Sequence, residues 1–208
     1  MRGDSDDDAL DWIIPLPRSR RSVPDAKHIR STWLTASQAA LREHGLGSRY
    51  EALLDPKYRD EILGAVPGVW LPMEIARAHY LACDALALPT ETLLEMGKSA
   101  TRRANASTLA FVRRVAQGTG ATPWTMLSQG ARLWQRTCDG GALGIARLGP
   151  KEARLHMVGL PLASIHYNRV TIRGIAIAVA ELFCQKAYAR ELARPDDAHA
   201  IVLRLSWV

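Results

Sequence analysis

The sequence predicts an α+β protein in which an N-terminal helical layer packs on a four-stranded antiparallel sheet. Apolar residues recur at helical spacing through the first two thirds of the chain, and beyond about residue 142 they alternate as in strands. The C-terminal half then reads strand, strand, helix, strand, strand. The 208 residues, 48% of them hydrophobic, are enough for the core of one domain.

Residues 1–24 are predicted to be a tail, disordered or docked on a partner, ahead of a single domain at residues 25–208. The tail, MRGDSDDDALDWIIPLPRSRRSVP, is acidic at one end, basic at the other and interrupted by prolines. Such a segment does not form a core of its own. Its apolar stretch WIIPLP is suited to docking in an extended form, on the body of the protein or on a partner.

Helical spacing and breaker residues place the helices of the first half. Thr90 is expected to cap a long helix whose inner face is mostly small, so that a neighbour approaches closely. Thr122 and Pro123 are expected to begin the last one, which Gly140 and Gly141 end. The other helices are expected at residues 25–45, 47–54, 56–64 and 72–86.

Alternation dominates the second half. ALGIARLGPKEARLHMVGL predicts two strands joined by GPKE, and KAYARELARPDDAHAIVLRLSW predicts two more around RPDD. An apolar helix is expected between these pairs, from Ser164 to Cys184. In the last strand Ile201, Leu203, Leu205 and Trp207 share the buried face.

Composition and motifs limit the classes of function that the sequence allows. The net charge of +6 and pI near 9.5 allow weak attraction to nucleic acid or anionic membranes without showing either. One helix face carries arginines, but no aromatic residues that would stack on bases share that face, so a solvated face competes with a nucleic-acid contact. The arginines are Arg102, Arg103, Arg113 and Arg114.

The cysteines predict neither a metal site nor a disulfide framework. Cys83, Cys138 and Cys184 lie far apart in apolar surroundings, as buried reduced thiols of a cytoplasmic protein do. No secretory signal or apolar run of roughly 18 residues is present. Hydrolase, nucleotide-binding and zinc-protease motifs are absent, which predicts a protein that is not an enzyme.

The stretch ASIHYNRVTIRG, residues 163–174, is open to two interpretations. In one, Ser164 caps a helix whose first turn holds His166 and Tyr167. In the other, Arg169 and Arg173, four residues apart on one helix face, bind a carboxylate or phosphate.

The element order and several short motifs resemble a known superfamily. These motifs are LREHGL, DPKYRDEIL and VWLPMEIARAHY before the long helix, then the LGP turn, the strand with Arg154 and Leu155, and the terminal Trp207. Residues 30–208 are similar to domains of unknown function, abundant in myxobacteria, within the superfamily of haem nitric-oxide-binding and four-vinyl-reductase domains. The resemblance implies a regulatory module that binds a small molecule, or a scaffold that dimerises.

The resemblance also implies where a haem site would show in the sequence. Haem sensors of the superfamily carry a Tyr-x-Ser-x-Arg motif and an upstream histidine, but here Arg169 and Thr171 follow Tyr167 at those positions. The region about thirty residues upstream, where the resemblance implies the histidine, offers Trp134 and Cys138 and no histidine. Some relatives carry cysteines near the last hairpin, which has none here. We therefore expect no metal and no cofactor, with haem less expected than an organic ligand.

These observations predict a non-enzymatic regulatory module that binds a small apolar or amphipathic ligand, or a protein partner, between the helical layer and the sheet. A dimerising structural adaptor and a nucleic-acid-associated protein are the alternatives. The residues expected to line the ligand site are Trp70, Met73, His79, Phe111, Trp134, Tyr167 and Arg173.

Overall fold

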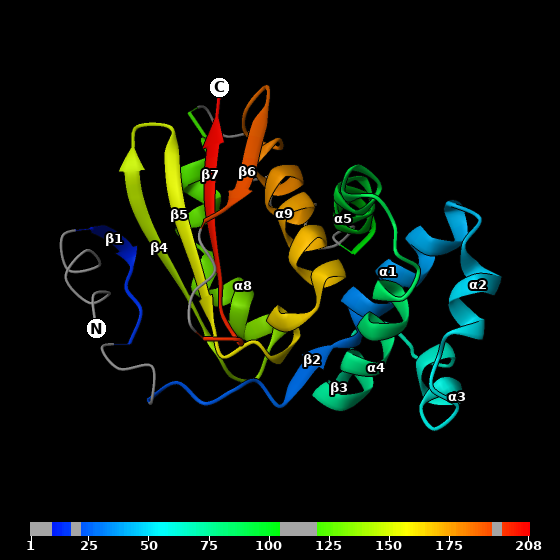
Figure 1. Cartoon of the computed structure of the whole chain (residues 1–208). Helices are drawn as coiled ribbons and strands as arrows, with labels where there is room; N and C mark the ends of the chain where they lie inside the picture. Colours follow the sequence, from blue (N-terminus) through cyan, green and yellow to red (C-terminus); the bar gives the residue numbers. More distant parts are fainter. Residues whose placement is uncertain (1–9, 18–21, 105–119, 193–196) are drawn as a thin grey trace.

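The computed structural model of the chain describes residues 10–17, 22–104, 120–192 and 197–208, with the side chains of residues 103 and 104 left aside. It confirms the α+β class: helices lie against an antiparallel sheet (Figure 1). The expected ligand residue Phe111 and the arginines Arg113 and Arg114 lie outside the described residues.

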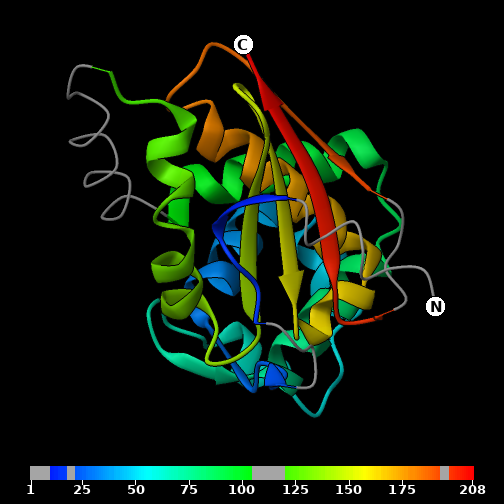
Figure 2. The ribbon, with the colours of Figure 1, turned by 90° about the vertical axis from the view of Figure 1, so that its left-hand side faces the viewer.

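The sheet has five strands rather than the four expected, in the order β1-β4-β5-β7-β6, and every neighbouring pair is antiparallel. The additional strand, Asp11–Ile14, comes from the WIIPLP region and pairs with β4 along one edge of the sheet (Figure 2). The strand bounds are β1 Asp11–Ile14, β4 Ala142–Gly149, β5 Glu152–Val158, β6 Ala187–Glu191 and β7 Ile201–Trp207.

The two predicted C-terminal strand pairs are confirmed, and both are antiparallel. β4 and β5 are joined at Pro150 and Lys151, and β7 lies between β5 and β6. Alternation in β7 buries Ile201, Leu203 and Leu205, because successive side chains of a strand point to opposite faces.

The helical layer follows the predicted order with shifted boundaries. The sequence predicts a helix from residue 25, but His28–Arg30 form β2, which pairs with β3, and the helix begins only at Ser31. Backbone pairing with a segment 40 residues away therefore overrides the local helical spacing. The bounds are β3 Trp70–Pro72, α1 Ser31–Glu43, α2 Gly47–Ala52, α3 Arg59–Leu63, α4 Met73–Asp84 and α5 Thr90–Ala104.

The single helix predicted after Thr122 is divided into two in the structure. Thr122 caps a helix that starts at Pro123, as predicted, with the reciprocal Thr122–Thr125 capping box. That helix ends at Leu127, and a second one begins at Gly130. The expected single helix is therefore α7 Pro123–Leu127 followed by α8 Gly130–Thr137.

The predicted helix 164–184 is α9, His166–Ala180, and Ser164 does not cap it. Ser164 belongs to the 3-10 turn Pro161–Ser164. The backbone N–H of Tyr167 instead donates to the Asp84 carboxylate at 2.6 Å. A side chain from the end of α4 thus supplies the N-terminal acceptor that a local serine was expected to supply.

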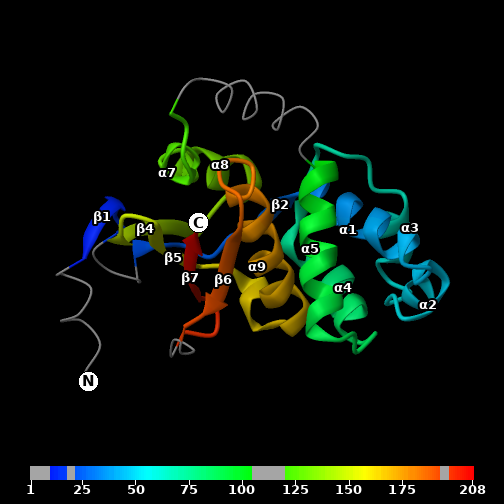
Figure 3. The same ribbon diagram turned by 90° about the horizontal axis from the view of Figure 1, so that it is seen from above.

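Helix α9 is sandwiched between α5 and the sheet (Figure 3). Gly97 of α5 and Gly174 of α9 face each other, and a Cβ at either would overlap a carbonyl oxygen of the other helix, that of Thr171 or Leu94. The expected close approach at the small face of α5 is therefore real. Gly174 therefore lets α9 approach α5 rather than the sheet.

We expect Gly97→Ala to lower the free energy of unfolding by about 3 kcal/mol, since the added methyl group forces two helix backbones apart. Urea denaturation measures this loss. Gly149→Ala is the matched control, because a Cβ there meets its nearest neighbour at 3.8 Å. Equal stability of the two variants would contradict the close contact of α5 and α9.

Candidate ligand-binding cavity

A cavity of about 660 Å³ lies between α9, α8 and the inner face of the sheet. Its volume falls in the range of sites for small molecules, about 300–1,000 Å³. Its principal apolar walls are Leu143, Ile145, Leu155, Met157, Leu203 and Leu205 from the sheet and Ile172, Ile175, Ala176 and Val179 from α9.

The apolar lining follows from the two periodicities in the sequence. The sheet residues are alternate positions of β4, β5 and β7, so all of them point to one face. Ile172, Ile175 and Val179 recur at helical spacing along α9, and all three are half-buried. The other face of α9, with Val170, Gly174 and Ile177, is buried in the body. Helix α9 therefore forms one wall of the cavity, and Thr32, Trp33 and Tyr80 of the helical layer also line it.

Most polar groups of the cavity wall are already hydrogen-bonded. Asn168 donates to the Leu162 carbonyl at 3.1 Å, and Thr171 to that of Tyr167 at 2.9 Å. The indole N–H of Trp134 donates to the Gly140 carbonyl at 2.8 Å. These bonds leave the wall largely apolar toward the cavity.

Tyr80 is a buried residue of the wall whose polar group is not paired in this way. It lies on α4, is only 7% exposed, and its hydroxyl has no hydrogen-bond partner among the described residues. Burial raises its pKa well above the usual value of a phenol. The hydroxyl is therefore a neutral group available to a ligand, since buried polar groups are normally paired.

Of the residues expected to line the site, Trp134 lines this cavity. Tyr167 lies one layer deeper, buried, with its hydroxyl 2.9 Å from that of Ser37. Arg173 of α9 approaches the Ala189 carbonyl of β6 at 3.4 Å. Tyr167 and Arg173 thus belong to the packing of α9 rather than to the cavity wall.

The expected residues from the helical layer are separate from the cavity. Met73 is buried at the start of α4. Trp70 is 39% exposed in β3, with the Arg30 guanidinium 4.0 Å from its ring centroid. His79 is fully buried on α4, where its Nδ1 lies 2.6 Å from the Tyr50 hydroxyl.

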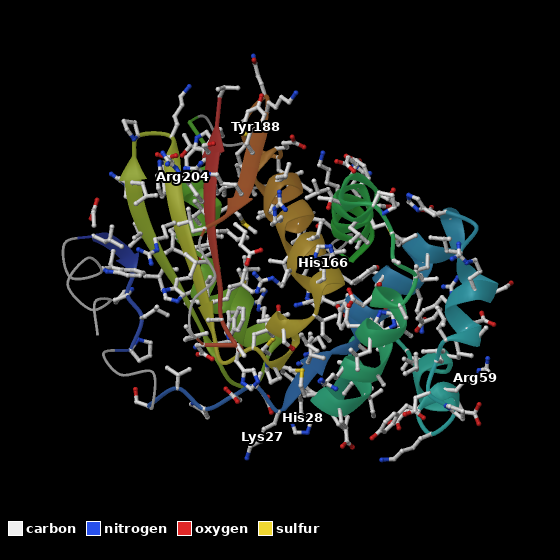
Figure 4. The ribbon with its side chains drawn as sticks, in the orientation of Figure 1. Lys27, His28, Arg59, His166, Tyr188 and Arg204 are labelled. Atoms are coloured by element: carbon white, nitrogen blue, oxygen red, sulfur yellow. The ribbon has the colours of Figure 1, made fainter. Side chains whose placement is uncertain are left out.

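Both arginines of the stretch 163–174 contact groups within the fold. Arg169 pairs with Glu191 of β6 and also donates to the Ala163 carbonyl at 3.2 Å. Arg173 contacts β6 as well. His166 is exposed at the start of α9 (Figure 4). These contacts favour the structural interpretation of the stretch, a helix start tied to the sheet edge.

The arginine face is largely beyond the described residues. Arg102, on α5, is exposed, and it is the one of the four arginines whose side chain the structure describes. Among the described residues, no three His, Cys, Asp or Glu side chains gather as metal ligands. Every helix in the described ranges is also too short or too polar to traverse a bilayer.

Sequence reasoning missed most of the cavity wall. The helical spacing of Ile172, Ile175 and Val179 is typical of a stripe packed in a core, but in the structure this stripe faces a cavity. A stripe that packs on a sheet and one that faces a space have the same sequence pattern. Tyr80 carried a signal, since it is a polar residue at a buried helical position beside His79.

Comparison with solved structures places the fold. The unliganded Fe(II) H-NOX protein from K. algicida matches with a TM-score of 0.61 at 9% identity, over 86% of this chain and 97% of that one. An oxygen-binding H-NOX domain related to soluble guanylate cyclases matches with a TM-score of 0.58 at 11% identity, over 86% and 95% of the chains. The fold is that of H-NOX domains, as the resemblance predicts.

Sequence comparison adds nothing to this. No family model matches the chain, and no curated protein does. At these identities the structural likeness establishes the fold alone.

The haem named for such domains can be tested against the donors of this cavity. Among the described residues, no histidine lines it. Burial raises the pKa of Cys138 to about 12, so its thiol is protonated in the metal-free protein, and iron would have to displace that proton to bind a thiolate. The residues 105–119, outside the described structure, contain no His, Cys, Met or Tyr. Met126 and Met157 line the cavity, but a thioether serves haem beside a histidine. Tyr80 presents a neutral phenol rather than a phenolate, because burial raises its pKa. The described wall thus offers no imidazole and no donor that is anionic in the metal-free protein, which does not suit an iron porphyrin.

His79 makes stability sensitive to mild acid. Tyr50, Tyr80 and Cys83 face it, and burial lowers its pKa from 6.5 to about 3. Below its unfolded-state pKa the unfolded chain takes up the proton and the folded chain does not, so stability falls as pH falls through the window from 6.5 to about 3.

We expect His79 to account for a loss of about 2 kcal/mol of unfolding free energy between about pH 7.5 and about pH 5. Urea denaturation at both pH values measures it. His79→Gln retains a hydrogen-bonding group without titrating, so its loss should be smaller by that amount. The same loss in both proteins would show that other groups cause it.

Proposed function

We propose that the protein is a non-enzymatic regulatory module that binds a small apolar or amphipathic molecule in the cavity between α9, α8 and the sheet. The observation that carries the proposal is the cavity itself. Protein interiors are packed as densely as organic crystals, and voids much larger than a water molecule are few. A continuous apolar space of about 660 Å³ is therefore best explained by an occupant.

The fold supports the proposal indirectly. Solved proteins of this fold are described as binding haem iron and oxygen, so the architecture accommodates ligands in other proteins. In this chain the ligand is proposed to be organic and held without an iron bond, because the donors of the cavity do not suit haem. The ligand then resides in the apolar space by burial of its own apolar surface.

Helix α9 is the proposed route from ligand to regulation. Its Ile172 and Val179 face the cavity, whereas Gly174 on its other side packs against α5. The Gly97–Gly174 contact leaves no room for α9 to approach α5 further. A ligand that pushes α9 must therefore move α5 with it, and the surface of the helical layer changes.

We expect the neutral fluorescent dye Nile red to bind with a saturable rise and blue shift of its emission, because the cavity excludes water. Ala176→Phe places a ring in the cavity and should weaken binding at least about tenfold. Ala131→Phe on α8 is the matched control, because Ala131 does not line the cavity. Absence of saturable binding, or equal loss in both variants, would contradict the proposed site.

A second test concerns the identity of the carried molecule. Native mass spectrometry of the purified protein is expected to show added mass that disappears on denaturation. Haemin added to the protein should keep the spectrum of free haemin, because the described wall offers no imidazole, and its thiol and phenol are protonated. A sharpened absorbance band near 400 nm, roughly where haem absorbs, would overturn the haem-free assignment. A dimer with no added mass would favour the adaptor function.

A further inference from the structure

The charged residues of the cavity wall are all of one sign. Arg30 and Arg136 line the cavity, and no Asp, Glu, Lys or His does among the described residues. The exposed members of the lining are Arg136 and Gly68, which places the rim of the cavity at these residues. An apolar interior thus meets solvent at two arginines.

The backbone brings the two arginines to the same rim. Ile29 of β2 forms an antiparallel bridge with Cys138, which follows α8. Arg30 directly follows Ile29, and Arg136 lies two residues before Cys138, at the end of α8, so the bridge holds both segments at the same part of the cavity. Residues more than 100 positions apart therefore supply one cationic rim.

The two arginines differ in how freely their guanidinium groups can move to bind a ligand. The guanidinium of Arg30 donates to the Gly68 carbonyl at 2.8 Å and stacks 4.0 Å from the Trp70 ring, which fixes its orientation. Arg136 is exposed, and no described residue forms a hydrogen bond or ion pair with its side chain. One cation is thus oriented by the fold, and the other is free to move onto a ligand.

The nearby carboxylate of Asp139 is used elsewhere. Its Oδ1 accepts the backbone N–H groups of Lys27 and His28, at 2.8 and 2.7 Å, and its Oδ2 lies 2.5 Å from Nδ1 of His28. Figure 4 shows Lys27 and His28 at the β2 end of the molecule. The carboxylate is held by three donors, so the arginines of the rim keep their charge for another anion.

The interior beyond the rim is long. The lining of α9 extends from Asn168 to Ala180, a span of about 18 Å at the rise of a helix. Ile175, Ala176 and Val179 form its middle part, and Leu155 and Leu203 of the sheet line the cavity opposite the helix. A space with a cationic end and an extended apolar interior matches a molecule with one anionic head and one apolar chain.

We propose that the ligand is a single-chain amphipathic carboxylate, with its head at Arg30 and Arg136 and its chain along α9. This inference rests on the proposed function, because it names the ligand class of the same cavity. Guanidinium groups bind carboxylates by paired charge-assisted hydrogen bonds. A neutral molecule of the same shape forgoes these bonds and binds through its chain alone.

The test uses myristate and myristyl alcohol, which share a chain and differ in the head, as competitors of Nile red on the full chain. Myristate is expected to bind about tenfold more tightly than the alcohol. Arg136→Gln should remove most of that difference and leave the affinity for the alcohol unchanged. Added salt should weaken binding of myristate only.

Arg132→Gln is the matched control, since Arg132 lies one turn earlier on α8, is exposed and does not line the cavity. Its affinity for myristate should equal that of the unmodified chain. Myristylamine should bind more weakly than the alcohol, because its ammonium group meets the two arginines.

The outcomes separate the two proposals. Equal binding of carboxylate and alcohol, with Arg136→Gln without effect, would overturn the anion preference and leave the apolar site standing. The site itself would be overturned if myristate, myristyl alcohol and myristylamine all failed to displace Nile red and if Ala176→Phe had no effect on binding of the dye. Equal losses in Arg136→Gln and Arg132→Gln would show a general charge effect and also reject the rim.

Discussion

The contact between α5 and α9 at Gly97 and Gly174 is the constraint on which the rest of the structure depends. Without side chains at these two positions, the helix backbones lie closer than any other residue pair permits. That contact ties one side of α9 to the helical layer, while Arg169 and Arg173 tie the helix to the edge strand β6. The cavity lies on the side of α9 that carries Ile172, Ile175 and Val179.

Around this contact, polar groups organise the helical layer while the sheet side of α9 remains apolar. Asp84 holds the start of α9, Ser37 bonds to the Tyr167 hydroxyl, and His79 bonds to Tyr50. Each bond joins different elements and satisfies a buried donor or acceptor. These polar groups bond to one another inside the helical layer, so they are not available to a ligand. Tyr80 is the main buried polar group that remains available in the cavity wall.

The likeness to H-NOX domains concerns the fold, whereas the lack of suitable iron ligands concerns a few side chains of the cavity wall. A fold is set by the packing of helices and strands, whereas a cofactor is held by a few side chains placed on it. Here the packing matches over 86% of the chain, and the residues that would ligate iron do not accompany it. An apolar space with arginines at its rim favours a ligand held by burial and charge over one held by a metal bond.

The sequence by itself determined the fold class, the two C-terminal hairpins, the Thr122 cap and the small face of α5, because these depend on local periodicity and local hydrogen bonds. Tertiary structure decided the rest. Asp84 replaced Ser164 as the acceptor at α9, β1 joined the sheet, and β2 took residues 28–30 from a predicted helix. The bridge between Ile29 and Cys138 likewise brought Arg30 to Arg136. Each of these joins residues far apart in the chain, and contacts between distant segments leave no periodic signal in either one.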